Sequence, residues 1–342
     1  MRELRFGVIG WGYWGPKIAR NLESLSNASV ATVADLDPCR LALLAGDRPL
    51  LQTTSQPLDV LQSDVDAVVI ATPVRTHYQL AKEALLHGKH VLVEKPLTAS
   101  VAEAEELLAL AEQAQRILMV GHTFEYSPAV NELRKLVREG ELGKIHCIEM
   151  ERVNLGLFRN DINVIWDLAP HDVSILLYLL GTKPVQVRAQ AHAHLRERIY
   201  DVAHIDLEFP GSTTAHIHVS WLHPCKIRRV TLIGDTRMAV YDDTNPAEML
   251  KIFNKGADIG ADPVVSYRNG AITIPYIEWT EPLRLQCEDF ANAIRQGTPP
   301  RADGQDGLEV VRILAAAEEA LETSLRSGEL VHVGYRNAYI SA

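Results

Sequence analysis

The chain has 342 residues, enough for two domains, and 47% of them are apolar, so each domain can bury a sizeable core. The net charge of −10 argues against a sequence-wide attraction to nucleic acid or to an anionic membrane. No apolar run reaches the ~18 residues that a membrane-spanning helix needs. The first predicted strand begins within a few residues of the N-terminus and leaves no room for a signal peptide. We therefore expect a cytoplasmic protein.

The four cysteines are far apart in the sequence, and none forms a Cys-x-x-Cys pair. This spacing indicates neither a structural zinc site nor a small disulfide framework, so we expect reduced thiols. These residues are Cys39, Cys147, Cys225 and Cys287.

A glycine-rich turn near the N-terminus is the most informative motif. Gly10, Gly12 and Gly15 form Gly-x-Gly-x-x-Gly between a predicted strand that begins at residue 4 and a predicted helix over 16–25. In this pattern the first glycine allows a tight turn, and the second lets the backbone approach a pyrophosphate. The third lets the helix pack close to the strand, with its free N–H groups facing the phosphates. The motif predicts a dinucleotide site, although a glycine turn of another α/β protein is the alternative.

An acid follows the next predicted strand, over 29–34, and supports the dinucleotide interpretation. Asp35 can accept hydrogen bonds from both ribose hydroxyls, and its carboxylate would repel the 2′-phosphate of NADP. We therefore predict NAD as the cofactor and disfavour NADP. Arg40 leaves this choice open, because its guanidinium could accommodate a phosphate.

Strands and helices alternate through the first 120 residues and predict a doubly wound parallel sheet. The expected strands cover 67–71, 90–93 and 117–120, and the expected helices cover 37–45, 58–62, 77–87 and 101–113. Ligands of such sheets bind beyond the carboxyl ends of the strands. The candidate functional residues after the glycine turn and Asp35 are Thr72, Pro73, His77, Glu94, Lys95, Pro96 and His122.

Lys95 stands at the end of a predicted strand, from where its ammonium would point into the cofactor crevice. Pro96 restricts the Lys95 backbone to extended conformations, and the bond between the two residues can be cis. The alternative interpretation is a surface lysine paired with Glu94.

These motifs together resemble the Gfo/Idh/MocA oxidoreductase family of glucose–fructose oxidoreductase, inositol dehydrogenase and relatives. The resemblance rests on the glycine turn, on Thr72-Pro73 with His77, on Glu94-Lys95-Pro96 and on a later Asp-x-x-x-His, and it covers essentially the whole chain. It implies an NAD(P)-dependent dehydrogenase or reductase. Its expected α/β fold has an N-terminal Rossmann domain over 1–122 and a C-terminal α+β domain over 123–342. The second domain would carry a large, mostly antiparallel, open-faced sheet.

Tyr13 and Trp14 lie inside the glycine turn. The resemblance implies cofactor contacts from Gly10, Gly12, Tyr13, Trp14, Gly15, Asp35, Thr72, Pro73, His77, Glu94, Lys95 and Pro96. The family's crossover often reads Arg-Phe-x-Pro. Here 125–128 reads Glu-Tyr-Ser-Pro, so the role of the family arginine does not carry over.

Asp167 and His171 are four residues apart and would share a face of a helix that ends near Gly181. A carboxylate one turn from an imidazole can orient it and raise its basicity, as a general base requires. Pro170 is harmless if the helix starts just before it and otherwise implies a kink. An unremarkable helix-surface histidine is the alternative. In the family, residues matching Lys95 and His171 assist hydride transfer at a sugar or polyol carbon.

The second half of the chain predicts one large antiparallel sheet flanked by helices. Strands are expected at 144–155, 185–194, 202–209, 213–221, 227–233, 250–253 and 271–275, and helices at 129–139, 283–296 and 308–326. The Pro210-Gly211 turn predicts a hairpin of 202–209 with 213–221. The family resemblance implies a homodimer or homotetramer through this sheet. Histidines alternate on two strands, but no acid or cysteine completes a ligand set, so we predict no metal site.

The substrate is the least determined property. Residues 12–16, 152–156 and 166–172 resemble the branch of the family that acts on nucleotide-activated sugars. This resemblance implies oxidation at C3 of a nucleotide hexose such as a UDP-N-acetyl sugar. The expected catalytic residues are Lys95, Asp167 and His171, and the expected further substrate contacts are Arg152, Arg159 and Asn163. An inositol or free-sugar dehydrogenase, a deoxysugar 3-ketoreductase and a non-catalytic NAD-sensing regulator are the alternatives.

Overall fold

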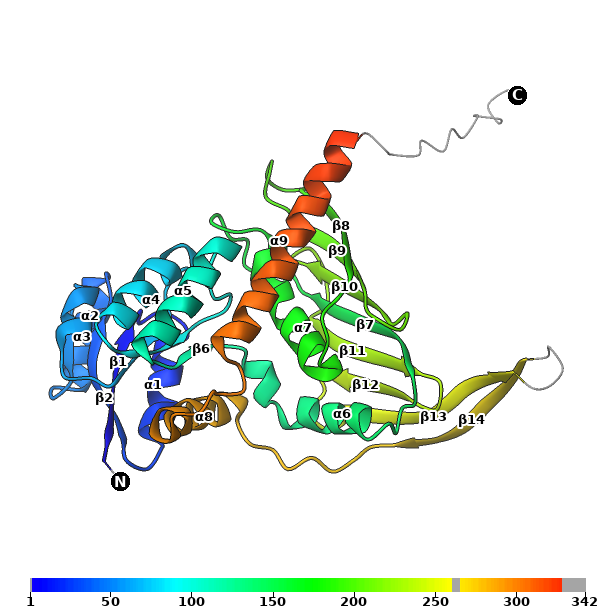
Figure 1. Cartoon of the computed structure of the whole chain (residues 1–342), viewed down its shortest axis with the longest axis horizontal. Coiled ribbons are helices and arrows are strands. Elements are labelled where there is room, and N and C mark those ends of the chain that lie inside the picture. Colours follow the sequence, from blue (N-terminus) through cyan, green and yellow to red (C-terminus); the bar gives the residue numbers. More distant parts are fainter. Residues whose placement is uncertain (1, 260–264, 328–342) are drawn as a thin grey trace.

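The computed structural model describes residues 2–259 and 265–327 and contains two sheets side by side (Figure 1). The longest helix, α9 (Gly304–Ser327), connects them, since it packs against both β6 (Leu118–Val120) and β8 (Gln186–His192). The groove between the sheets is where strand ends of the first sheet meet helices of the second.

The first sheet is parallel and has the order β3-β2-β1-β4-β5-β6. Its winding reverses between β1 and β4, which is where doubly wound sheets bind ligands. This confirms the predicted fold of the N-terminal part. The other strands are β1 (Leu4–Ile9), β2 (Ala28–Ala34), β3 (Gln52–Thr54), β4 (Ala67–Ile70) and β5 (His90–Val93). The helices are α1 (Gly15–Glu23), α2 (Pro38–Asp47), α3 (Pro57–Gln62), α4 (His77–Leu86) and α5 (Val101–Ala114), with short 3₁₀ turns η1 (Val74–Thr76) and η2 (Thr123–Tyr126).

The second sheet has the order β14-β13-β12-β11-β7-β10-β9-β8. Neighbouring strands are antiparallel except for β7 and β10, so the predicted, mostly antiparallel sheet is confirmed. The predicted hairpin is also formed, as β9 and β10, whose pairing runs from Val202 opposite Ser220 to Glu208 opposite Thr214. The strands are β7 (Ile145–Val153), β9 (Val202–Glu208), β10 (Thr214–Ser220), β11 (Ile227–Gly234), β12 (Met238–Asp242), β13 (Leu250–Ile259) and β14 (Val265–Thr273).

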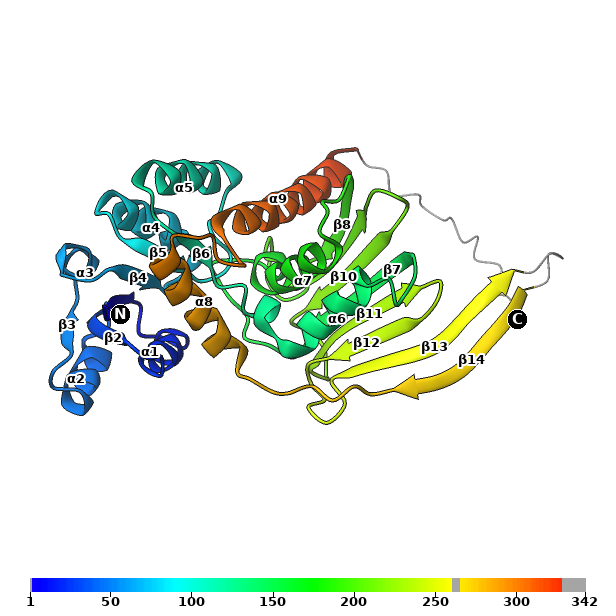
Figure 2. The same cartoon turned by 60° about the horizontal axis from the view of Figure 1, so that its bottom comes forward.

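Helices cover one face of the second sheet and leave the other face open (Figure 2). On the covered face, Ile205 of β9 and Ile217 of β10 are buried against α7 (Val164–Leu180), and α6 (Pro128–Arg138) lies beside it. His204, the neighbour of Ile205, points to the open face, as strand alternation requires. The open face is polar over its centre and carries Glu149, Glu151, His204, Asp206, His216, His218 and Arg229.

The chain returns to the first sheet after completing the second. Helix α8 (Pro282–Gln296) packs on α1, and its Phe290 ring lies 6.0 Å from the ring of Phe6 on β1. Leu283 and Cys287 of α8 belong to the same buried cluster. The core beneath the glycine turn is therefore closed by residues almost 300 positions away in the sequence.

The sequence analysis did not predict strands β3 and β12. Two other predicted strands differ in length from the observed ones. The predicted strand 250–253 continues to Ile259, and the predicted strand 271–275 overlaps the end of β14, which begins at Val265. Beyond Phe253 these strands pair with each other in a hairpin that extends away from the body (Figure 2). Since most of β14 is exposed, it has no apolar alternation for the sequence to reveal.

Three further features of the described residues concern the cysteines, the start of α2 and the lengths of the helices. All four cysteines are free. Asp37 caps α2 by accepting hydrogen bonds from the N–H groups of Cys39 and Arg40. Of the helices described, none combines the length and the apolar character needed to cross a membrane.

Candidate active site

The glycine turn has the geometry that its spacing predicted. Gly10 has a φ of 98°, and a Cβ atom there would lie 2.5 Å from the carbonyl oxygen of Ala71. A Cβ atom on Gly15 would lie 2.0 Å from the carbonyl oxygen of Gly10. A Cβ atom on Gly12 would meet only the Arg40 guanidinium, at 3.8 Å. Gly10 and Gly15 are thus required by the fold, whereas Gly12 leaves open space toward the cleft.

Asp35 follows the last residue of β2, close to the glycine turn. Its carboxylate accepts hydrogen bonds from the N–H of Trp11 at 2.6 Å and from the N–H of Asp37 at 2.8 Å. The guanidinium of Arg40 is 3.5 Å away and half exposed. The acid is therefore fixed at the strand end, and Arg40 stands beside it as the sequence analysis anticipated.

A cleft of about 640 Å³ opens above these strand ends. Most of its exposed lining is apolar, as suits the adenine and nicotinamide rings of a dinucleotide. Of the predicted cofactor residues it is lined by Gly10, Gly12, Tyr13, Trp14, Asp35, Thr72 and Pro73. The sequence analysis missed Ser55, Pro57, Arg75, Thr76, Gln79 and Leu80, although those from Arg75 to Leu80 follow β4 in the same way as Thr72. The residues present fit a dinucleotide, because the open space at Gly12 lies at this cleft.

His77 and Glu94 lie behind the cleft and do not face it. The His77 ring is buried, with Nδ1 2.8 Å from the carbonyl oxygen of Pro96 and Nε2 2.8 Å from that of Thr72. Burial lowers the pKa of His77 and raises that of Glu94 to about 7. The peptide bond between Lys95 and Pro96 is cis. These residues shape the backbone from which the Lys95 side chain leaves β5.

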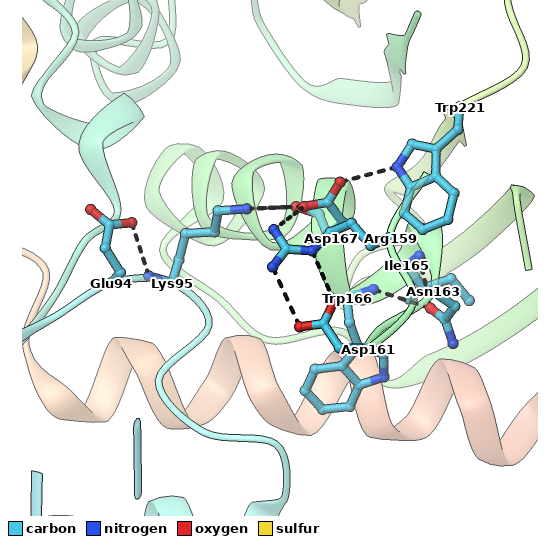
Figure 3. Close-up of polar contacts among 9 residues, drawn as sticks. All are labelled: Glu94, Lys95, Arg159, Asp161, Asn163, Ile165, Trp166, Asp167 and Trp221. Carbon is cyan, nitrogen blue, oxygen red and sulfur yellow. Dashed lines mark hydrogen bonds and ion pairs between the residues drawn. The ribbon is translucent and has the colours of Figure 1, made fainter. Parts of the chain in front are cut away.

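Lys95 crosses from the first sheet to the start of α7 (Figure 3). Its Nζ donates a hydrogen bond of 2.6 Å to the backbone carbonyl of Asp167 and lies 3.8 Å from the Asp167 carboxylate. The side chain is only 13% exposed. Burial lowers the Lys95 pKa, against the opposing effect of the Asp167 and Glu94 carboxylates. The two halves of the predicted catalytic set therefore converge.

Besides Lys95, two groups from other parts of the chain hold the Asp167 carboxylate. Trp221, just after β10, donates its indole N–H to Oδ2 at 3.0 Å. Arg159 lies 3.8 Å from Oδ1 and also pairs with Asp161 at 3.2 Å (Figure 3). Sequence analysis missed Trp221 and Asp161, although Trp221 marks the end of a predicted strand.

His171 is one helical turn beyond Asp167, but the expected hydrogen bond between them is not formed. Its Nδ1 is buried and has no hydrogen-bond partner in residues 2–259 and 265–327, because the Asp167 carboxylate faces Lys95, Arg159 and Trp221. The imidazole instead packs edge-to-face on Phe124, with the ring centroids 5.0 Å apart. Burial, then the positive charges of Lys95 and Arg152, lower the His171 pKa well below its ordinary value. The ring is therefore neutral, and Pro170 lies inside α7 rather than at its start.

Arg152 does not have the position that the predicted substrate contact requires. Its guanidinium is 4% exposed and pairs bidentately with Asp172, at distances of 2.9–3.1 Å. It also lies over the Phe124 ring, 4.6 Å from the centroid. The fold is the reason. Arg152 points toward the underside of α7, where its guanidinium packs on the Phe124 ring, and that ring in turn contacts the His171 imidazole.

Asn163 also differs from its predicted role. Its side-chain oxygen accepts hydrogen bonds from the N–H groups of Ile165 and Trp166, which makes it the N-cap of α7. Its side-chain nitrogen donates to Glu318 of α9 at 2.7 Å. These contacts at both ends of the side chain fix the start of α7 and give Asn163 a structural role.

His122 is the remaining strand-end candidate. It is fully buried, and neither ring nitrogen has a hydrogen-bond partner among the described residues. Burial, followed by the Lys95 charge, lowers its pKa to about 3. No group of three or more His, Cys, Asp or Glu side chains in 2–259 and 265–327 is arranged to hold a metal ion.

Comparison with known proteins agrees with this geometry. Residues 4–122 match the GFO/IDH/MocA oxidoreductase family, described as an NAD-binding Rossmann fold, and residues 130–240 match the GFO/IDH/MocA C-terminal domain. The chain belongs to this family. It is an oxidoreductase of the dehydrogenase type, and the predicted family is confirmed.

Two sequence relatives and one solved structure span nearly the whole chain. UDP-N-acetylglucosamine 3-dehydrogenase of Acidithiobacillus ferrooxidans is 32% identical over 95% of this chain and 100% of its own length. A solved structure of the dehydrogenase GnnA from the same organism superposes with a TM-score of 0.79, at 30% identity over 95% of this chain and 100% of the other. Inositol 2-dehydrogenase of Rhodococcus jostii is 27% identical over 95% of this chain and 92% of its own length.

Proposed function

We propose that this protein is an NAD-dependent dehydrogenase that oxidises the C3 hydroxyl of a nucleotide-activated hexose, such as a UDP-N-acetyl sugar. The supporting observation is the convergence of Lys95 from the first sheet on the start of α7, one turn from His171. A secondary alcohol between these side chains would meet a hydrogen-bond donor and a neutral imidazole together. The 32% identity with a UDP-N-acetylglucosamine 3-dehydrogenase supports the choice of substrate.

In the proposed reaction, the Lys95 ammonium donates a hydrogen bond to the substrate oxygen and stabilises the developing alkoxide. His171 accepts the hydroxyl proton, for which its neutral ring is the correct form. Asp167 holds the Lys95 ammonium in place, with Trp221 and Arg159 fixing the carboxylate. Bound NAD supplies the hydride acceptor at the cleft. Reduction of the ketone would use the same groups in reverse.

NAD is the proposed cofactor because the Asp35 carboxylate stands at the end of β2, where a 2′-phosphate would be repelled. The opposing influence is Arg40, at 3.5 Å. Binding measurements with NAD and NADP on the wild type and on Asp35→Ser therefore test the assignment. Tighter binding of NADP to the wild type would contradict it.

Assembly and location follow from the same proposal. We propose that 1–122 forms the cofactor unit and 123–342 the substrate and assembly unit of a cytoplasmic enzyme. The open, polar face of the second sheet would join the copies of a homodimer or homotetramer. Light scattering of the purified protein measures this, and a monomer at micromolar concentration would contradict it.

The deciding experiment follows NADH absorbance with UDP-N-acetylglucosamine, myo-inositol and free hexoses. Turnover of the UDP-sugar is expected, and a deuterium label at its C3, but not at C2 or C4, should move to the reduced cofactor. Turnover of inositol alone would replace the proposed substrate, since inositol 2-dehydrogenases are also relatives. Tight NAD binding with no turnover would favour a regulator instead.

A further inference from the structure

Two cations at the start of β11 belong to no role assigned above. Lys226 is exposed, and Arg228 is partly exposed. They come from the second sheet, whereas the glycine turn and α1 of the first sheet supply the donors for the cofactor pyrophosphate. In a chain of net charge −10, a second group of cations beside the site needs a separate explanation.

Strand register shows where Arg228 points. It lies opposite Arg152 in the pairing of β11 with β7, and opposed residues of neighbouring strands project from the same face. Arg152 reaches Asp172 on α7, so Arg228 also projects toward α7, where His171 lies. Its positive charge is among the influences that lower the His171 pKa, after burial and the charges of Lys95 and Arg152. Arg228 therefore faces the candidate active site.

The Arg228 guanidinium has hydrogen-bond donors that no described residue uses. One terminal nitrogen pairs with Asp243 at 3.1 Å, and Asp243 also accepts a hydrogen bond from the hydroxyl of Tyr241. The other guanidinium nitrogens have no partner in the portion of the chain that the structure describes. The side chain is 38% exposed, so these donors are accessible to a ligand. A planar guanidinium fixed at one corner is well suited to a phosphate.

An aromatic pair from the glycine turn lines the cofactor cleft. The rings of Tyr13 and Trp14 pack edge-to-face at 5.1 Å, and Tyr13 is 72% exposed. The Lys17 ammonium lies 3.2 Å from the Tyr13 ring centroid. The Tyr13 pKa is lowered first by Lys17, and also by the charges of Lys226 and Arg228. Both rings line the cofactor cleft, and the charges of Lys226 and Arg228 extend to Tyr13.

We propose that Arg228, with Lys226 two residues before it, binds the diphosphate of a nucleotide-activated sugar. This inference rests on the proposed function and adds a subsite that recognises the nucleotide half of the substrate. With the hexose held between Lys95 and His171, the phosphates extend outward past Arg228.

Arg229 provides a matched control. It is the next residue of β11, is also paired with an aspartate, Asp242, at 2.9 Å, and has a similar exposure of 45%. Strand alternation points it to the open face of the sheet, away from the site. Each of the variants Arg228→Ala, Lys226→Ala and Arg229→Ala loses one positive charge. The first two should therefore differ from the third only because their lost charge faced the candidate active site.

The test titrates UDP into the NAD-loaded protein by calorimetry and measures rates with UDP-N-acetylglucosamine. Loss of one charge-assisted contact should weaken UDP binding and raise the KM of the UDP-sugar by ~10–100-fold, with a smaller change in kcat. The NAD affinity should stay unchanged, and Arg229→Ala, compared in the same oligomeric state by light scattering, should keep the wild-type UDP affinity. Arg228→Lys should recover part of the loss, because it keeps the charge without the fork.

Each other result has a definite meaning. Unchanged UDP affinity and KM in both Arg228→Ala and Lys226→Ala, with the UDP-sugar still turned over, would overturn the subsite and leave the proposed function intact. A loss of NAD affinity equal to that of UDP would also overturn it, since the cations would then serve the cofactor. If the wild type neither binds UDP nor oxidises any UDP-sugar, the proposed function itself fails. If Arg228→Ala does not fold, the exposed Lys226 supplies the test.

Discussion

The two sides of the candidate active site are built in different ways. On the first-sheet side, backbone geometry dominates: Gly10 and Gly15 have no room for a side chain, and the ligand would lie along strand ends. On the second-sheet side, charged side chains dominate, with Arg152 and Asp172 buried as an ion pair and Asp167 held by Trp221. This comparison shows that a binding surface formed by the backbone can be inferred from residue spacing. A surface formed by paired charges cannot, because it depends on which partner each charged side chain contacts. Four experiments test this contrast.

The largest expected effect is on the second-sheet side. Arg152→Ala leaves the Asp172 carboxylate buried without its partner, which should lower the free energy of unfolding by ~3–5 kcal/mol. Urea unfolding measures the loss. As a control, Arg188→Ala removes an exposed partner of Glu208 and should cost less than ~1 kcal/mol. Similar losses in the two variants would contradict the supporting role assigned to Arg152.

Lys95 is the group that joins the two sides. Lys95→Ala removes the donor to the developing alkoxide and should lower kcat by ~10²–10³-fold, with NAD affinity retained. Steady-state rates with the active substrate and NAD titration by fluorescence provide the two measurements. Lys82→Ala, which removes an exposed lysine paired with Glu106 on the helices beside the first sheet, should leave both values unchanged. Full activity of Lys95→Ala would refute the proposed role.

Glycine substitutions test the first-sheet side. Gly15→Ala drives a Cβ atom against the Gly10 carbonyl and should lower the free energy of unfolding by ~1–3 kcal/mol. Gly12→Ala has space for its Cβ atom and should keep the wild-type stability while weakening NAD binding. Thermal unfolding and NAD titration separate these effects. Equal stability of the two variants would mean that the turn is less constrained than its geometry indicates.

The expected effect at Glu94 is a slope of stability with pH and not a fixed loss. Burial raises the pKa of this carboxyl to about 7, above its value in the unfolded chain, so the folded state holds the proton more tightly. Its contribution to stability is therefore complete at low pH and falls as the pH rises from ~4.3 to about 7, by at most ~1.4 kcal/mol per pH unit. Glu94→Gln should remove this slope in unfolding measured between about pH 5 and pH 8. Parallel curves for the wild type and the variant would contradict the raised pKa.

The sequence by itself determined the parallel sheet, the glycine turn, Asp35 at the end of β2 and Lys95 at the end of β5. These features are local, because each depends on residue spacing within one strand, turn and helix. The mostly antiparallel second sheet and its β9–β10 hairpin were also predictable, since apolar alternation and a Pro-Gly turn specify them. The long β13–β14 hairpin was not, because its exposed strands lack that alternation.

Only the tertiary structure decided the partners of the charged residues. Arg152 and Asn163 carried the right chemistry for a substrate contact, yet one pairs with Asp172 and the other caps α7. Asp167, expected to orient His171, instead meets Trp221 and Lys95. Arg228 gave no motif, and its register with Arg152 revealed where it points. A charge binds whatever opposite group the fold brings within reach, and that choice depends on contacts between residues far apart in the sequence.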